Sequence, residues 1–156
     1  MGILTSSSET AFTQSPATVY DFVTDPRNWP KTYPGSTGIE GVEELPLKVG
    51  DVWSEKGQIG AEEQLFTWRL LTAVRPTKFV FQSIGLLGKH LDGTGGWEGI
   101  MTISYTFSTP GTGVTLFHRN LSTEVPKFAT IPDAILLSHA PSHIDSYHEG
   151  VGKLLG

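Results

Sequence analysis

The stretch WEGIMTISYTF, residues 97–107, alternates apolar and polar side chains with the clearest regularity in the chain. Successive side chains of an extended strand point to opposite faces, so this alternation predicts a β-strand with one apolar face. The apolar face carries Trp97, Met101, Ile103, Tyr105 and Phe107. The opposite face carries Glu98, Thr102, Ser104 and Thr106. A sheet built from such strands needs another element to cover its aromatic face.

Similar signals on both sides of this stretch extend the sheet. Between residues 35 and 126, turns rich in Gly and Pro separate segments with strand-like composition. The strands that we predict there span residues 37–45, 51–59, 62–74, 77–84, 97–107 and 113–122. Segment 3–13 is rich in Ser, Thr and apolar residues and lacks Gly and Pro, which predicts an opening strand. The sequence therefore predicts seven antiparallel strands.

Two short helices are expected between the first and second strands. Ser15-Pro16 and Asp25-Pro26 each place a capping residue before a proline, which suits the first position of a helix. Pro30 limits the second helix to a turn or two, because proline inside a helix removes a hydrogen bond.

The C-terminal segment returns to a helical period. Thr130 and Asp133 have the spacing of a capping box, so we expect a helix of about 25 residues that begins near Ile131 and bends near Leu137 because of Pro141. Its apolar stripe consists of Leu136, Leu137, Ala140, Ile144, Tyr147, His148, Val151, Leu154 and Leu155. The sequence thus predicts an α+β fold, with a seven-stranded curved antiparallel sheet wrapped around a long C-terminal helix. This helix cannot fill the concave face completely, so a cavity for a small molecule is expected.

Composition narrows the function classes. The chain has 156 residues, no cysteine, and 11 Lys+Arg against 16 Asp+Glu, and we interpret residues 1–156 as one domain. Without cysteine, disulfides, thiolate metal sites and thiol catalysis are excluded. The acidic balance makes nucleic acid an unfavourable partner. No run of about 18 apolar residues and no signal peptide are present, so we expect no membrane span and a cytoplasmic location.

Four segments carry a family resemblance. They read SPATVYDFVTDPRNWPKTYPG (15–35), VGDVWSEKG (49–57), TWRLLTAVRPTKFVFQS (67–83) and ISYTFSTPGTGVTLFHRNL (103–121). With the terminal helix, they resemble the SRPBCC group, also called START-like or helix-grip proteins, and within it the polyketide cyclase/dehydrase-like branch. The resemblance covers nearly the whole chain and implies the helix-grip fold, with a deep pocket for a hydrophobic or aromatic small molecule. It implies no cofactor, and it leaves open whether the chain is a monomer or a homodimer.

Arg119 is a candidate for chemistry on the last strand. His118 and Arg119 are adjacent, so they point to opposite faces, and alternation alone does not decide which one faces inward. The pattern Phe-x-Arg-x-Leu resembles relatives in which the arginine points inward, and we favour Arg119. Such an arginine would either hold a carboxylate or an enolate, or pair with an acid across the sheet.

Two further candidates could move protons. His148 lies in the apolar stripe, where it either acts as a general acid or base or fills the core. Glu55 is either a buried carboxylate with a raised pKa and a proton acceptor, or a solvated strand acid. His139 and His143 have the spacing of two metal ligands, but they lie off the stripe and Pro141 distorts their spacing, so no metal site is expected.

The expected pocket lining is aromatic. The ligand-binding residues that we predict are Trp53, Trp68, Phe81, Trp97, Tyr105 and Tyr147. Three hypotheses remain: a cyclase, aromatase or dehydratase that uses Arg119, Glu55 or His148; a carrier or sensor of a lipid-like molecule; and a partner regulator that uses the outer sheet face. Convergence of ionisable side chains on one point favours catalysis, whereas a dry aromatic cavity favours transport.

Overall fold

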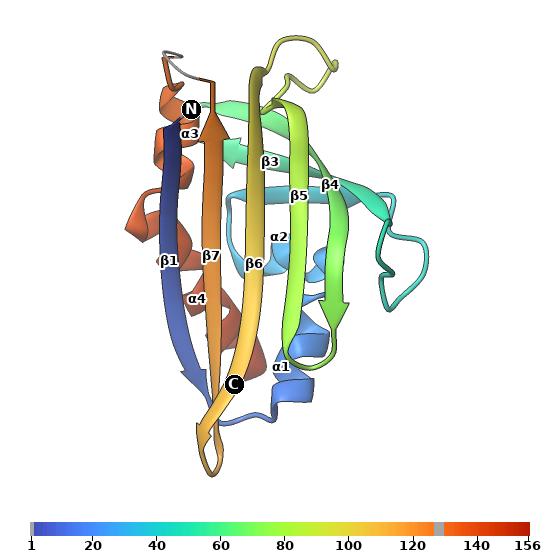
Figure 1. The fold of residues 1–156 in the computed structure, drawn as a ribbon, viewed down its shortest axis with the longest axis vertical. Helices are drawn as coiled ribbons and strands as arrows, with labels where there is room; N and C mark the ends of the chain where they lie inside the picture. Colours follow the sequence, from blue (N-terminus) through green and yellow to red (C-terminus); the bar gives the residue numbers. More distant parts are fainter. Residues whose placement is uncertain (1, 127–129) are drawn as a thin grey trace.

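One antiparallel sheet dominates the computed structural model, which describes residues 2–126 and 130–156. Its seven strands follow the order β1-β7-β6-β5-β4-β3-β2 (Figure 1), which confirms the predicted sheet. The strands are β1 Gly2–Phe12, β2 Ser36–Glu40, β3 Val52–Ile59, β4 Glu62–Val74, β5 Lys78–Leu87, β6 Trp97–Gly111 and β7 Val114–Val125. The predicted strand 37–45 is too long, because the chain leaves the sheet at Gly41, whose φ of 89° favours glycine.

Three short helical segments connect β1 to β2, where the Ser-Pro and Asp-Pro signals predicted two short helices, because the segment after Asp25-Pro26 begins as a 3-10 helix and continues as a separate α-helical turn. They are α1 Pro16–Val23, the 3-10 helix η1 Pro26–Asn28 and α2 Trp29–Thr32. The Ser15 hydroxyl caps α1 by accepting a hydrogen bond from the Thr18 backbone N–H at 3.2 Å. The Asp25 carboxylate caps η1 by accepting from the Arg27 N–H at 3.0 Å.

The C-terminal segment forms two helices where the sequence predicted one bent helix. They are α3 Asp133–Ser138 and α4 Pro141–Leu155. Ala140 is extended (φ −64°, ψ 136°) and Pro141 is the first residue of α4, so the proline starts a new helix instead of bending an old one. The expected capping box at Thr130 does not form, since α3 begins at Asp133 without a side-chain cap.

Helix α4 lies behind the sheet in Figure 1 and is fixed on two sides. On one side, the Ser8 hydroxyl of β1 donates to the Asp145 carboxylate at 2.7 Å. On the other side α4 packs closely on α2, where a Cβ at Gly150 would overlap the carbonyl oxygen of Thr32. A glycine at position 150 therefore sets the distance between the two helices.

Aromatic rings fill the space between the sheet and the helices. Phe81 of β5 lies at the centre of this layer and is 1% exposed. Its ring centroid is 5.1–5.7 Å from those of five other rings, which belong to Trp29, Trp53, Trp68, Phe79 and Tyr105. These separations are typical of favourable aromatic pairs, so the layer is a packed core.

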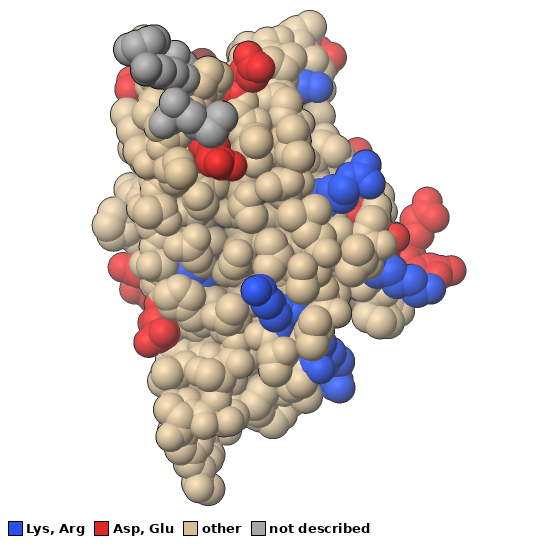
Figure 2. Space-filling model, viewed as in Figure 1, with Lys and Arg blue, Asp and Glu red and all other residues tan. Residues whose placement is uncertain are grey.

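The outer face of the sheet carries few charges. In Figure 2, Lys and Arg side chains are scattered over one side of this face and form no continuous stripe. Among the residues that the structure describes, no helix is long and apolar enough to span a membrane.

The approach of α4 to α2 gives a test of the fold. Gly150→Ala should lower the free energy of unfolding by about 1–3 kcal/mol or more, because the added methyl group overlaps the Thr32 backbone. Gly152→Ala is the matched control. Nothing lies within 4 Å of its added Cβ, and alanine should stabilise the helix by about 0.5–1 kcal/mol. Urea unfolding of both variants measures the difference, and equal effects would contradict the packing described here.

Candidate functional site

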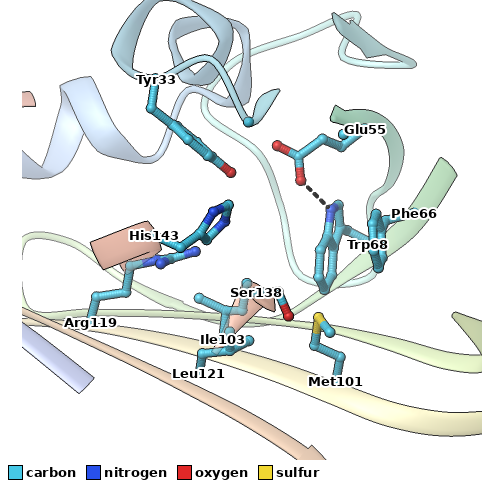
Figure 3. Close-up of a pocket in the computed structure, with 12 residues that line it drawn as sticks. Tyr33, Glu55, Phe66, Trp68, Met101, Ile103, Arg119, Leu121, Ser138 and His143 are labelled. Atoms are coloured by element: carbon cyan, nitrogen blue, oxygen red, sulfur yellow. Dashed lines mark hydrogen bonds between the residues drawn. The ribbon is translucent and has the colours of Figure 1, made fainter. Parts of the chain in front are cut away.

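A small internal cavity lies between the concave face of the sheet and the C-terminal helices. Its volume is ≈ 40 Å³, which exceeds the roughly 10–15 Å³ that a cavity needs to hold one water molecule but is far below the size of a drug-like ligand site. Its lining consists of Tyr33, Gly35, Glu55, Gly57, Phe66, Trp68, Met101, Ile103, Arg119, Leu121, Ser138 and His143 (Figure 3). A void of ≈ 10 Å³ adjoins it and shares Tyr33, Glu55, Ile103 and Arg119. The interior thus contains a narrow polar space within an aromatic core.

Arg119 supplies the positive charge of this space. It lies on β7 opposite Tyr105 of β6 and is 6% exposed, whereas its neighbour His118 points outward and pairs with Glu9 at 3.2 Å. The Arg119 guanidinium carbon is 5.0 Å from the centroid of the Tyr147 ring, a cation–π contact. Its Nε and Nη1 atoms are buried and have no hydrogen-bond partner among the described residues. Buried donors of this kind are costly, because they lose their water without a replacement.

Glu55 supplies the negative charge. It lies on β3, is 8% exposed, and accepts a hydrogen bond from the Trp68 indole N–H at 3.1 Å, drawn as the dashed line in Figure 3. Its second oxygen, Oε2, is buried and has no hydrogen-bond partner in residues 2–126 and 130–156. Burial raises the pKa of the Glu55 carboxyl, and the nearby Ser36 hydroxyl, the Trp68 N–H and the Arg119 charge oppose this only in part.

The two charges face the same cavity without forming an ion pair. No ion pair joins Glu55 and Arg119 in the described part of the chain. Figure 3 shows Tyr33 and His143 between them, with the Tyr33 hydroxyl pointing into the space. Unpaired donors on one side and an unpaired acceptor on the other are groups that a polar molecule in the cavity could satisfy.

Three tyrosines surround the charged pair. Burial raises the pKa of Tyr33, Tyr105 and Tyr147, so their phenols are neutral at physiological pH. The Tyr105 hydroxyl donates to the Tyr147 hydroxyl at 3.3 Å. These phenols add neutral hydrogen-bonding groups to the site without adding charge.

His143 is half-buried and lines the cavity. It also lines an outer groove of ≈ 290 Å³, together with Gln58, Gly60, Leu137, Ala140 and Ser142. Its ring meets that of Tyr33 edge to face at 5.5 Å. Burial, and secondarily the charge of Arg119, lowers the pKa of His143 and favours its neutral form. An opening at His143 would join the groove to the cavity.

His148, the third residue predicted to be catalytic, lies outside the cavity. It is 3% exposed, stacks on Phe117 at 4.9 Å, and its Nδ1 is 2.7 Å from the Thr10 hydroxyl. It lines neither the cavity nor the adjoining void. The structure therefore brings Arg119 and Glu55 together and places His148 in the core behind them.

Of the six aromatic residues predicted to line the pocket, some line the two interior spaces and others do not. Trp68 lines the cavity, and Phe81, Tyr105 and Tyr147 line the adjoining void. Trp53 lines neither, because it packs against Trp29 and Phe81 in the core. Trp97 is half-buried at the first residue of β6 and lines neither space.

Sequence reasoning missed Tyr33 and His143. Tyr33 follows a four-residue helix, where no periodic pattern exists to orient it. His143 had a signal, since it lies four residues before Tyr147 and therefore on the same side of α4.

His139 contacts Ser6 through Nδ1 at 3.2 Å and Thr123 through Nε2 at 2.6 Å. The described residues contain no group of three or more His, Asp or Glu side chains suited to a metal ion.

Comparisons with known proteins support the fold. No family model and no curated protein matches the sequence. Among solved structures, the chain is similar to Ara h 8.0201, with TM-score 0.70 and 16% identity over 99% of both chains. A START superfamily protein from Mycobacterium smegmatis gives TM-score 0.70 and 15% identity over 97% of this chain and 99% of that one. The structure of norcoclaurine synthase from Thalictrum flavum, in complex with dopamine and hydroxybenzaldehyde, gives TM-score 0.69 and 14% identity. The match covers 99% of this chain and 87% of that one.

His148 predicts an acid-dependent loss of stability. Burial lowers its pKa from 6.5 to about 4, so the unfolded chain binds more protons than the folded one between these values. Stability should therefore fall as the pH is lowered through this window. His148→Gln should reduce this dependence, as measured by thermal unfolding across the window. The exposed His90→Gln is the control and should keep the dependence of the parent chain.

Glu55 predicts the opposite sign. A raised carboxyl pKa means that the folded chain binds more protons than the unfolded one above the ordinary Glu value, so stability is lost as the pH rises toward the folded pKa. Glu55→Gln mimics the protonated form and should raise the melting temperature at neutral pH by a few degrees, with a smaller effect in acid. The control is Glu63→Gln at an exposed position, which should change the melting temperature little. A destabilised Glu55→Gln at neutral pH would contradict this account.

Proposed function

We propose, from the helix-grip fold that this chain shares with START-like proteins, that its interior binds a hydrophobic or aromatic small molecule that carries a carbonyl group. We further propose that the site moves a proton next to that carbonyl, the chemistry of a polyketide cyclase or aromatase. The observation that carries both proposals is the pair of buried, oppositely charged side chains, Glu55 and Arg119, that line one cavity with unpaired polar atoms.

The charges suit enolisation followed by ring closure. Glu55 would remove a proton from the carbon next to the carbonyl, which breaks a C–H bond and forms an O–H bond on the carboxyl. The electron pair moves to the carbonyl oxygen, where the unpaired Arg119 N–H groups stabilise the negative charge. The carbanion then attacks a second carbonyl group of the same substrate molecule and forms a C–C bond. Glu55 returns its proton to the new alkoxide. Atoms and charge balance without a cofactor.

Binding requires the wall of the cavity to move. A ligand pocket typically has about 300–1,000 Å³, whereas the interior space has ≈ 40 Å³. The outer groove of ≈ 290 Å³ begins on the other side of His143. Displacement of His143, the third residue of α4, would merge the two spaces into one of ligand size. The aromatic rings around Phe81 would then form its apolar wall.

A proton-exchange experiment separates the enzyme from the carrier. The probe is 2-acetylnaphthalene, an aromatic methyl ketone, incubated with the protein in heavy water and followed by NMR. We expect the protein to accelerate deuterium incorporation into the methyl group, and Glu55→Gln and Arg119→Gln to lose most of this acceleration. The exposed Arg69→Gln is the matched control and should retain it.

The alternative function is a carrier, which the apolar lining of the cavity supports. Native mass spectrometry of the purified protein, with a search for a co-purifying small molecule, tests binding independently of chemistry. Binding of a ligand or of the ketone without accelerated exchange would establish the carrier. Absence of both a co-purifying molecule and any binding of apolar probes would overturn the interior site itself.

A further inference from the structure

The unpaired atoms of the site indicate more than a carbonyl group. We propose that the ligand's head group is an anionic oxygen group that binds Arg119, and that Glu55 takes up a proton when this group binds. This inference rests on the proposed interior site and specifies which ligands it prefers. An enolate beside a protonated Glu55 has the same charge distribution, so a stable anion would resemble the proposed intermediate.

The first step of the argument concerns Arg119. Its side chain is more than nine-tenths buried, and its Nε and Nη1 donors point to no acceptor. The guanidinium carbon lies 5.0 Å from the centroid of the Tyr147 ring, a contact that gives Nε and Nη1 no hydrogen-bond acceptor. A neutral carbonyl could accept these hydrogen bonds, but an anion would accept them and also neutralise the buried charge. The site therefore favours the anion.

The second step concerns the groups that face Glu55. The strands beside β3 present Ser36 and Trp68, and α3 presents Ser138, none of which titrates near neutrality. The remaining polar groups around the two spaces are the phenols of Tyr33, Tyr105 and Tyr147, the His143 imidazole and the Arg119 guanidinium. Burial keeps the phenols and the imidazole neutral, so Arg119 is the permanent positive charge in this set.

The third step follows from these charges. An anion on Arg119 cancels the positive charge that favours the Glu55 carboxylate, and it adds a negative charge in the same buried space. Two negative charges in one poorly solvated site do not both remain ionised, and the ligand's charge is the one held by hydrogen bonds from Arg119. The proton therefore goes to Glu55, which also gives its unpaired Oε2 a hydrogen to donate.

A pair of probes with one aromatic skeleton tests this inference. 8-Anilinonaphthalene-1-sulfonate carries a sulfonate, and N-phenyl-1-naphthylamine is the same skeleton without it. The sulfonate stays ionised across the working range, so any proton change on binding belongs to the protein. Titration calorimetry in two buffers of different ionisation enthalpy, repeated between about pH 6 and about pH 9, measures the number of protons taken up.

We expect the sulfonate probe to bind more tightly than the neutral probe, with uptake of a proton over part of this range. The neutral probe should bind with no uptake. Glu55→Gln should keep sulfonate binding and lose the uptake, whereas Arg119→Gln should weaken sulfonate binding by about tenfold or more, to the level of the neutral probe. Binding of the neutral probe by Arg119→Gln shows that this variant is folded, and the exposed Arg69→Gln and Glu63→Gln are the matched controls.

The outcomes separate the two proposals. If neither probe binds the parent protein, the interior site is wrong. If both probes bind with equal affinity, or if the sulfonate binds without proton uptake at any pH in the range, the site stands and the inference about its head group is overturned. Uptake that persists in Glu55→Gln would also overturn it, because another group would then accept the proton.

Discussion

The aromatic layer centred on Phe81 is the constraint on which the rest of the structure depends. A strongly curved sheet has a concave face that one helix cannot fill, and here rings from α2, β3, β4, β5 and β6 meet around one phenylalanine to fill most of it. Rings that interlock at these separations leave little freedom to collapse further. The remaining space is therefore confined to the place where side chains are polar, between Glu55 and Arg119.

The buried Glu55 and Arg119 side chains lower the stability of the folded chain. A structural acid and base in a core normally satisfy each other through hydrogen bonds, whereas Glu55 and Arg119 each turn to a different aromatic partner, Trp68 and Tyr147. Among the described residues, Ser36, Trp53, Gln64 and His148 also bury a polar atom without a partner, but only Glu55 and Arg119 combine this with ionisable groups of opposite charge that line the cavity. Such unpaired groups are typical of sites that give up stability for binding, which is the role we propose for this pair. The site is also buried and bounded by neutral phenols, so a small change in its charge has a large electrostatic effect.

The sequence predicted the strands well, because alternation and Gly-Pro turns are local signals. It could not decide between His118 and Arg119, since alternation assigns neighbours to opposite faces without saying which face is concave. It also could not say how far along a strand the cavity extends. Trp97 shares a face with Tyr105, yet only Tyr105 reaches the interior space. The helix break at Pro141 and the place of Tyr33 depend on how segments distant in the sequence pack together, and no local pattern records this.

The pairing of β1 with β7 has a consequence for how the chain is made. Strand β1 precedes the other strands of this sheet in the chain and hydrogen-bonds to β7, so the sheet cannot be completed until Val125 has emerged from the ribosome. During that time β1 is an unpaired strand, the kind of segment that tends to associate with other chains. Its middle reads Thr5-Ser6-Ser7-Ser8, four small hydroxyl side chains with no apolar surface to offer a neighbour. In the folded protein Ser8 bonds to Asp145 of α4, so a side chain that offers a neighbouring chain little apolar surface later helps to hold the helix.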